Sequence, residues 1–235
     1  MFRNGSPVEL DKHLVTFTEP SSFEAEQYRR LRQRIEAAGT QRELRIIAIT
    51  SAVASDGKTL TAVNLAGALA RKRGSRVLLI DADLRHPSVA KTLALDSADR
   101  GLSAALQGAD GPLAKFVQAV GDTTLSVLPC ETACTGTYEL LTSPRLTELI
   151  KEARSQYDYV IVDTSPIIPV PDSGLLRQLV DGYIVIVSAR STPRKLLGEA
   201  LNLLEPASVI GLVFNRDDRP LFGYYRSHYG QYFRS

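Results

Sequence analysis

Short apolar runs rich in β-branched residues alternate along the chain with segments that show helical periodicity. Six such runs are predicted to be β-strands, at residues 44–50, 76–81, 124–129, 157–163, 182–188 and 208–214. The main helical patterns between them cover residues 58–72, 144–155 and 193–205. Four of the runs are almost continuously apolar at their centres, which is typical of strands covered on both faces. The alternation therefore predicts an α/β fold with a doubly wound, mostly parallel sheet flanked by helices.

Composition narrows the class of partner. The 235 residues are 44% hydrophobic and 23% charged, and a net charge of +2 gives no field that would favour nucleic acid. Apolar runs end at about seven residues, far short of a membrane span, and residues 1–10 lack the apolar core of a secretory signal. Cys130 and Cys134 make a poor metal site, and the simpler interpretation is that they are small buried residues or loop residues. We expect a cytoplasmic protein.

The segment ITSAVASDGKTLTAVNLAGALA joins the first predicted strand to a helix and contains a phosphate-loop signature. The usual pattern is G-x-x-x-x-G-K-[ST], and Ala52 stands in place of its first glycine. Such a loop turns backbone N–H groups around phosphate oxygens at a helix N-terminus, where the helix dipole also favours anions. Lys58 would contact the β- and γ-phosphates, and Thr59 would bind Mg²⁺. The residues expected to bind the nucleotide are Ser55, Asp56, Gly57, Lys58, Thr59 and Leu60.

Carboxylates close two later strands. Asp81 ends the second predicted strand and is followed by Asp83 and Arg85, while Asp163 ends the fourth. Beside a phosphate loop such residues can hold Mg²⁺, accept a hydroxyl proton or stabilise phosphoryl charge. Taken singly, each also fits a solvated turn or a carboxylate that caps its own loop. Their order favours one Mg²⁺-nucleotide site. The expected catalytic residues are Lys58, Asp81, Asp83 and Arg85, and the expected metal ligands are Thr59, Asp81 and Asp163.

Two further segments flank this core. Residues 21–38 predict a helix with a Ser21/Glu24 capping box and arginines over much of its surface. Its apolar face comprises Tyr28, Leu31, Ile35 and Ala38. The arginine-rich face is either solvated or a subunit contact; we favour the contact, with Glu26 paired to arginines within the helix or across subunits. Residues 1–20 are expected to be a flexible polar lead-in.

The order of TSAVASDGKT, LLIDADLRHP and VIVDTSP resembles that of the bacterial tyrosine kinases (BY-kinases), phosphate-loop enzymes related to the MinD/ParA ATPases. The most specific part is D-x-D-x-R, matched at Asp81, Asp83 and Arg85. The resemblance implies a kinase domain at residues 21–215 and a tyrosine-rich tail at 216–235. It also implies that an E-x-x-R-x-x-R motif lies at the subunit contact of a ring-shaped oligomer and that tail tyrosines accept phosphate. The motif residues are Glu26, Arg29 and Arg32, and the acceptors are Tyr224, Tyr225, Tyr229 and Tyr232.

The phosphate loop departs from the family pattern P-G-E-G-K-S, because Ala54, Ser55 and Asp56 replace its first three residues. Ser55 stands where backbone near the phosphates is expected to need a positive φ, which favours glycine. Residues 135–137 (TGT) also stand before YELLTSPRL, where a PNPxELL-like stretch is expected. These changes bear on the catalytic rate more than on the fold.

The segment FNRDD near the C-terminus bears on the choice of base. Asn215 and Asp218 superficially fit the N-K-x-D guanine motif, whereas the resemblance implies that Asn215 contacts adenine. We favour ATP, with Mg²⁺ as the accompanying ion.

The resemblance implies an ATP-dependent protein tyrosine autokinase that regulates capsular or exopolysaccharide synthesis and export. Its γ-phosphate would pass to tail tyrosines of a neighbouring subunit. Implied partners are a Wzz-like polysaccharide co-polymerase, which would recruit the chain to the inner face of the cell membrane, and a protein tyrosine phosphatase. The alternatives are a MinD/ParA-like switch ATPase and a nucleotide-binding regulator without kinase activity. A switch ATPase requires neither the D-x-D-x-R motif nor the tail.

Overall fold

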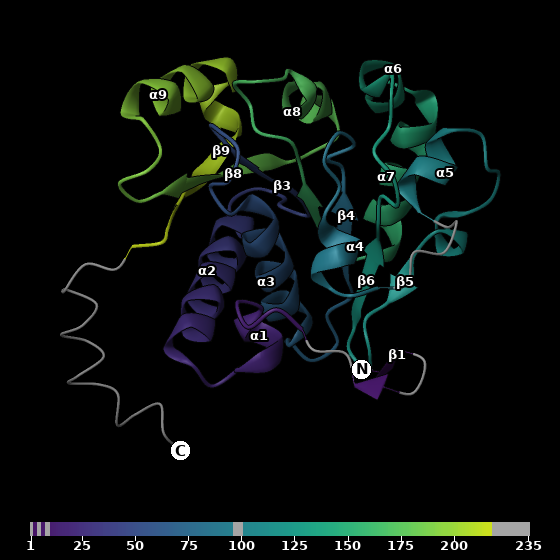
Figure 1. The fold of residues 1–235 in the computed structure, drawn as a ribbon, viewed down its shortest axis with the longest axis horizontal. Helices are drawn as coiled ribbons and strands as arrows, with labels where there is room; N and C mark the ends of the chain where they lie inside the picture. Colours follow the sequence, from purple (N-terminus) through teal and green to yellow (C-terminus); the bar gives the residue numbers. More distant parts are fainter. Residues whose placement is uncertain (1, 4–5, 8–9, 96–100, 218–235) are drawn as a thin grey trace.

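One seven-stranded sheet lies at the centre of the computed structural model (Figure 1). The structure describes residues 2–3, 6–7, 10–95 and 101–217. The strand order is β5-β6-β4-β7-β3-β8-β9, and each neighbouring pair is parallel except β5 and β6. In chain order the strands are β3 (Ile46–Ser51), β4 (Val77–Asp81), β5 (Gln118–Ala119), β6 (Leu125–Leu128), β7 (Tyr159–Asp163), β8 (Gly182–Ser188) and β9 (Val209–Asn215).

The predicted fold class is confirmed. Each of the six predicted strands is present, and each begins and ends within two residues of its predicted range. The short strand β5 was not predicted, because its two residues carry no periodic pattern and are defined by pairing with β6. A separate two-stranded sheet, also not predicted, pairs β1 (Phe2–Arg3) with β2 (Ser6–Pro7).

Helices cover both faces of the sheet because successive residues of a strand point to opposite sides. Ile47 and Ile49 of β3 pack in one core with α2 and α3, whereas Ile46 packs in a second core with α7. All residues of β3 and β8 are buried, as expected for strands covered on both faces. The longer helices are α2 (Phe23–Gly39), α3 (Lys58–Ala70), α7 (Pro144–Gln156) and α9 (Arg194–Leu203). The shorter ones are α1 (Val15–Thr18), α4 (Val89–Thr92), α5 (Leu102–Leu106), α6 (Thr137–Leu141) and α8 (Asp172–Leu175), with the 3₁₀ turns η1 (Leu113–Lys115), η2 (Leu176–Gln178) and η3 (Pro206–Ser208).

Helix α2 begins one residue later than the predicted capping box requires. Ser22 has the extended backbone of an N-cap, and its side chain accepts a hydrogen bond from Ala25 N (3.1 Å). The predicted Ser21/Glu24 box is therefore wrong, since a box built on Ser22 would need a glutamate where Ala25 stands. The apolar face is confirmed for three residues that pack against the core, Leu31, Ile35 and Ala38.

Residues 10–20 pack against α3 instead of forming a flexible lead-in. Leu14 is fully buried in the core that α3 shares with the sheet. Thr16 donates from its backbone N and from Oγ1 to Asn64 Oδ1 (3.1 and 3.2 Å), and Asn64 Nδ2 donates to His13 O (2.9 Å). The prediction is wrong for this part of the chain because one buried amide inside α3 satisfies the polar groups of the segment.

Candidate nucleotide site

The phosphate loop runs from the end of β3 to the first turn of α3, and two of its residues have left-handed backbone. Gly57 is the N-cap of α3 with φ +94°, and Ser55 has φ +66°. The expectation that Ser55 takes a positive φ is therefore confirmed. Ala52, in the place of the first glycine, is fully buried in a small apolar cluster, so a methyl side chain fits at this position. The backbone N–H groups in the first turn of α3, which begins at Lys58, have no carbonyl partner within the helix and are available to an anion.

Ser55→Gly is expected to stabilise the nucleotide-free protein by about 1 kcal/mol, because left-handed backbone costs serine roughly that amount and costs glycine little. Thermal unfolding of the two proteins measures the difference. Ser155→Gly, at an exposed position inside α7, is the matched control and should be destabilising through the low helix propensity of glycine. A Ser55→Gly protein less stable than the wild type would contradict strain at this position.

The Lys58 side chain forms an ion pair with Asp83, with Nζ 2.7 Å from Oδ2. Both side chains are largely buried, at 12% and 2% exposure. Burial alone would lower the pKa of Lys58, but the charges of Asp163 and Asp83 raise that pKa overall, so the amine stays protonated. The other Asp83 oxygen accepts a hydrogen bond from His86 N (3.1 Å), which fixes the carboxylate. A cationic group is thus held ready beside the phosphate loop.

Asp81 and Asp163 lie opposite one another at the ends of β4 and β7, and both are fully buried. Burial, together with the charge of Asp163, raises the pKa of Asp81 to about 8. Burial also raises the pKa of Asp163 to about 6, against the lowering effects of Lys58 and Thr59. Thr59 Oγ1 donates to Asp163 Oδ2 (2.6 Å), and Asp81 Oδ2 accepts from two backbone N–H groups in the turn that begins α4. The predicted convergence of the two carboxylates is confirmed.

These carboxylates fit a divalent cation. Asp81 Oδ1 and Asp163 Oδ1 are buried and have no hydrogen-bond partner within the described residues. In that part of the chain, no group of three or more histidine, cysteine or acidic side chains could hold a metal ion by itself. Mg²⁺ does not require such a group, because it commonly binds one or two carboxylates together with water and substrate phosphates. A cation beside these oxygens would favour the charged form of both carboxylates, which burial disfavours.

Arg85 forms a bidentate ion pair with Asp172 of α8. Its Nε and one terminal nitrogen lie 2.7 and 3.1 Å from the two carboxylate oxygens. Arg85 is 40% exposed, so its guanidinium stays at the rim of the site while the carboxylate orients it. Sequence reasoning missed Asp172, because no motif links two residues this far apart along the chain.

Asn215, at the end of β9, reaches the phosphate loop. Its Nδ2 donates to Asp56 O (2.9 Å), and a Cβ added at Gly57 would lie 2.1 Å from the same nitrogen. A side chain at this position would therefore displace the Asn215 amide, and the positive φ favours glycine independently. Asp218, the other residue of the predicted base motif, lies outside the described residues, and adenine contact by Asn215 stays a prediction.

The motif residues of α2 make contacts within the chain. Glu26 pairs with Arg29 at 2.5 Å and with Arg30 at 3.9 Å, so the intrahelical pairing is confirmed. Arg32 donates to Ala68 O of α3 (3.0 Å). The subunit contact of Glu26, Arg29 and Arg32 stays a prediction. The predicted acceptors lie outside the described residues: Tyr224, Tyr225, Tyr229 and Tyr232.

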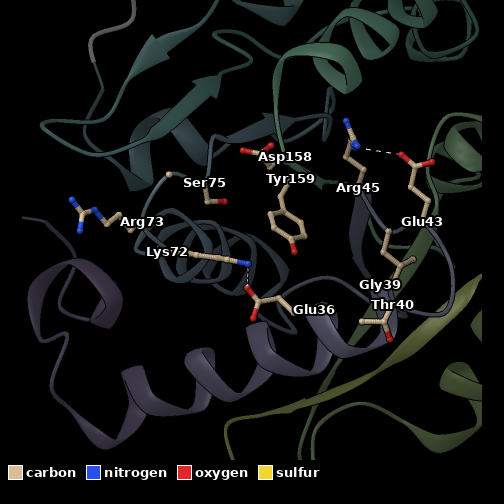
Figure 2. Close-up of a pocket in the computed structure, with 12 residues that line it drawn as sticks. Glu36, Gly39, Thr40, Glu43, Arg45, Lys72, Arg73, Ser75, Asp158 and Tyr159 are labelled. Atoms are coloured by element: carbon tan, nitrogen blue, oxygen red, sulfur yellow. Dashed lines mark hydrogen bonds and ion pairs between the residues drawn. The ribbon is translucent and has the colours of Figure 1, made fainter.

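A pocket of about 480 Å³ lies at the opposite edge of the sheet, where β3, β4 and β7 begin (Figure 2). Charged residues around it pair with one another: Lys72 lies 3.0 Å from Glu36, and Arg45 lies 3.3 Å from Glu43. None of the residues predicted for the nucleotide site lines this pocket. The candidate phosphate site is instead at the carboxyl edge, where the fold class predicts ligands to bind. Among the described residues, no helix has both the length and the apolar character needed to cross a membrane.

Comparison with known proteins gives the same assignment from sequence and from fold. The AAA domain family matches residues 44–198. Tyrosine-protein kinase YwqD of Bacillus subtilis (strain 168) is 36% identical over 208 residues, covering 88% of this chain and 86% of that protein. Succinoglycan biosynthesis transport protein ExoP of Rhizobium meliloti (strain 1021) is 34% identical over 230 residues, which are 91% of this chain but 29% of ExoP. The kinase domain of Escherichia coli tyrosine kinase ETK superposes with a TM-score of 0.81 at 28% identity, covering 89% of this chain and 81% of that one.

The matched region includes the phosphate loop, the D-x-D-x-R motif and the aspartate that ends β7. The same side chains meet at one edge of the sheet in the structure. The chain therefore belongs to the bacterial tyrosine kinases, a family of P-loop transferases.

Proposed function

We propose that the chain is an ATP-dependent tyrosine kinase that phosphorylates the C-terminal tyrosines of a neighbouring copy of itself. The observation that carries the proposal is the meeting of one cationic and three acidic side chains beside a phosphate loop. The residues concerned are Lys58, Asp81, Asp83 and Asp163. A nucleotide switch would use the loop and a single acid, whereas the additional carboxylates and Arg85 suit transfer to a hydroxyl.

The transfer would proceed by in-line displacement at the γ-phosphorus. Tyrosine has a pKa of about 10, so its hydroxyl is mostly protonated at neutral pH and needs positioning. Asp81 or Asp83 orients this hydroxyl and accepts its proton as the new oxygen–phosphorus bond forms. The bond from the γ-phosphorus to the bridging oxygen breaks, and ADP leaves with that electron pair. Lys58 leaves its ion pair with Asp83 and stabilises the charge of the phosphate.

The backbone of residues 55–60 would hold the phosphates, and Thr59 with Asp163 and Asp81 would hold Mg²⁺. The ion, when bound, supplies positive charge to the phosphate oxygens. The Thr59 hydroxyl would then exchange its bond to Asp163 for contact with the ion. Arg85, oriented by Asp172, lies where it can stabilise phosphoryl charge or contact the incoming segment.

Autophosphorylation is expected to dissociate an assembly of these chains. Each phosphate adds roughly −1.5 to −2 charges at neutral pH, so phosphorylation of Tyr224, Tyr225, Tyr229 and Tyr232 would turn a basic segment strongly acidic. Light scattering coupled to size separation, before and after incubation with ATP and Mg²⁺, measures the assembly. An unchanged particle mass after full phosphorylation would contradict this expectation. Arg32→Ala tests the α2 contact and should lower the mass before any ATP is added.

Mass spectrometry of phosphotyrosine tests the proposed activity itself. The wild-type protein incubated with ATP and Mg²⁺ should carry phosphotyrosine within residues 218–235. A chain truncated after Asp217 should incorporate far less phosphate under the same conditions. Release of inorganic phosphate without phosphotyrosine would favour the switch ATPase. Nucleotide binding without either product would favour the non-catalytic regulator.

The names of the relatives support a proposal for the biological setting. ExoP is named as a transport protein of succinoglycan biosynthesis. We infer that this chain likewise serves exopolysaccharide or capsule export, through a membrane co-polymerase that recruits it to the inner face of the membrane. A protein tyrosine phosphatase would reset the cycle. Co-purification of this chain with a candidate co-polymerase from the same genome tests the partnership, and a strain from which the chain is deleted is the control.

A further inference from the structure

Asp56, in the middle of the phosphate loop, is held at two points by loops at the carboxyl edge of the sheet. Its carbonyl oxygen accepts a hydrogen bond from Asn215 Nδ2 (2.9 Å). Its carboxylate oxygen Oδ1 accepts one from Thr192 Oγ1 (2.8 Å), in the turn between β8 and α9. Asp56 is 2% exposed, and its second oxygen, Oδ2, has no hydrogen-bond partner within the described residues. The Thr192 hydroxyl therefore supplies a hydrogen bond that a buried carboxylate needs.

The direction of the Thr192 bond is fixed by the turn that contains it. Ser188 N donates to Thr192 Oγ1 (2.8 Å), and a backbone N–H can only donate. The hydroxyl accepts that bond and keeps its own hydrogen for Asp56. The turn is closed by Thr192 N donating to Ser188 O (3.0 Å), and Ala189 N donates to Asn215 O (2.8 Å). Thr192 and Asn215 thus belong to one hydrogen-bonded unit at the ends of β8 and β9.

This unit supports the strained part of the loop. Asp56 lies between Ser55 and Gly57, which have φ values of +66° and +94°. A left-handed serine persists where the surrounding structure fixes it. The two bonds to Asp56 hold the loop by a side chain and by the backbone, in a conformation whose N–H groups can surround an anion. Without them, Ser55 would relax toward the backbone that serine prefers.

We propose that Thr192 is a positioning residue for the nucleotide, acting through Asp56 to keep the phosphate loop in its binding conformation. This inference rests on the nucleotide site of the proposed function but does not depend on transfer to tyrosine. A purely local role, in which Thr192 only closes its own turn, predicts lower stability with unchanged nucleotide affinity. Affinity therefore separates the two roles.

Calorimetric titration with Mg²⁺-ADP tests the proposal. Thr192→Val removes the hydroxyl and is expected to weaken binding about tenfold, the factor equivalent to about 1.4 kcal/mol. Thr192→Ser keeps the hydroxyl and should bind within about twofold of the wild type. Thr124→Val is the matched control: it removes a hydroxyl that donates to Ala70 O (2.9 Å) at the opposite edge of the sheet, and its affinity should be unchanged. Thr192→Ala provides the same readout should the valine variant fail to fold.

A second comparison tests the link to backbone strain. In a Ser55→Gly background, Thr192→Val should weaken binding by only about twofold to threefold, because glycine needs less support at a positive φ. Wild-type affinity in both the valine and the alanine variant at position 192 would overturn the proposal. So would an equal loss of affinity in the serine and valine variants, or an equal loss of affinity in both backgrounds. A wild-type protein that takes up no Mg²⁺-ADP would overturn the proposed nucleotide site together with this inference.

Discussion

Lys58→Met is expected to reduce the rate of tyrosine autophosphorylation by about 100-fold to 1,000-fold. Methionine keeps the length and the apolar stem of the side chain but removes the charge that would stabilise the transferring phosphate. In the structure this charge is held 2.7 Å from Asp83 in a nearly buried environment, where electrostatic interactions are stronger than in water. The measurement is the initial rate of phosphotyrosine formation with ATP and Mg²⁺, by quantitative immunoblot.

Lys72→Met is the matched control for this substitution. Lys72 lies just beyond the other end of α3, is 53% exposed and pairs with Glu36 at the edge of the sheet opposite the nucleotide site. Its loss should leave the rate near that of the wild type. Phosphotyrosine formation at the wild-type rate in Lys58→Met would contradict the role of Lys58 and point to a contaminating kinase or another site.

Asp81→Asn is expected to stabilise the nucleotide-free protein while removing its kinase activity. In the Mg²⁺-free protein, burial and the charge of Asp163 raise the pKa of Asp81 to about 8, and burial raises the pKa of Asp163 to about 6. Unfolding returns both groups to ordinary values near 3.8. At pH values between the pKa of the unfolded state and those of the folded state, the folded protein binds more protons than the unfolded chain. The free energy of unfolding therefore falls as pH rises. The amide cannot ionise, and the variant should gain on the order of a few kcal/mol at about pH 8.

Urea unfolding in the presence of a chelator, at about pH 5 and about pH 8, measures this effect. The stability difference between Asp81→Asn and the wild type should be small at the lower pH and large at the higher one. Asp158→Asn is the control, because a hydrogen bond from Arg76 N lowers the pKa of Asp158 and a neutral side chain there gives no gain at high pH. An Asp81→Asn protein no more stable than the wild type at about pH 8 would refute the raised pKa of Asp81.

The sheet and the meeting of the candidate site residues at one of its edges could be predicted because their signals are local. A continuous apolar run predicts a buried strand wherever it occurs, and the aspartates that end β4 and β7 must meet because neighbouring parallel strands end at the same edge. The left-handed backbone of Ser55 was predicted on similar grounds, from the glycine that related chains carry in the loop. Cys130 and Cys134 are buried, which is one of the two placements predicted for them.

The contacts that could not be predicted join residues far apart in the sequence. Asp172 orients Arg85, Thr192 holds Asp56, and neither residue carries a motif of its own. The packing of residues 10–20 could not be predicted for the same reason, since Asn64 inside α3 forms hydrogen bonds with their polar groups. The capping error on α2 was of another kind, because Ser21 and Ser22 are adjacent and only the backbone decides which of them caps the helix.

A crystal structure with Mg²⁺ and ADP shows directly whether the side chains of the candidate site bind one magnesium–nucleotide complex, since ADP fills the phosphate loop without turnover. We expect the diphosphate to lie on the backbone of residues 55–60 and Lys58 Nζ to move from Asp83 to a phosphate oxygen. We also expect Mg²⁺ to lie against Thr59 Oγ1, with Asp163 contacting the ion directly or through a water molecule. Electron density for the nucleotide elsewhere on the molecule would contradict the proposed nucleotide site. A diphosphate bound with Lys58 still paired to Asp83 and no ion near Thr59 would contradict it as well.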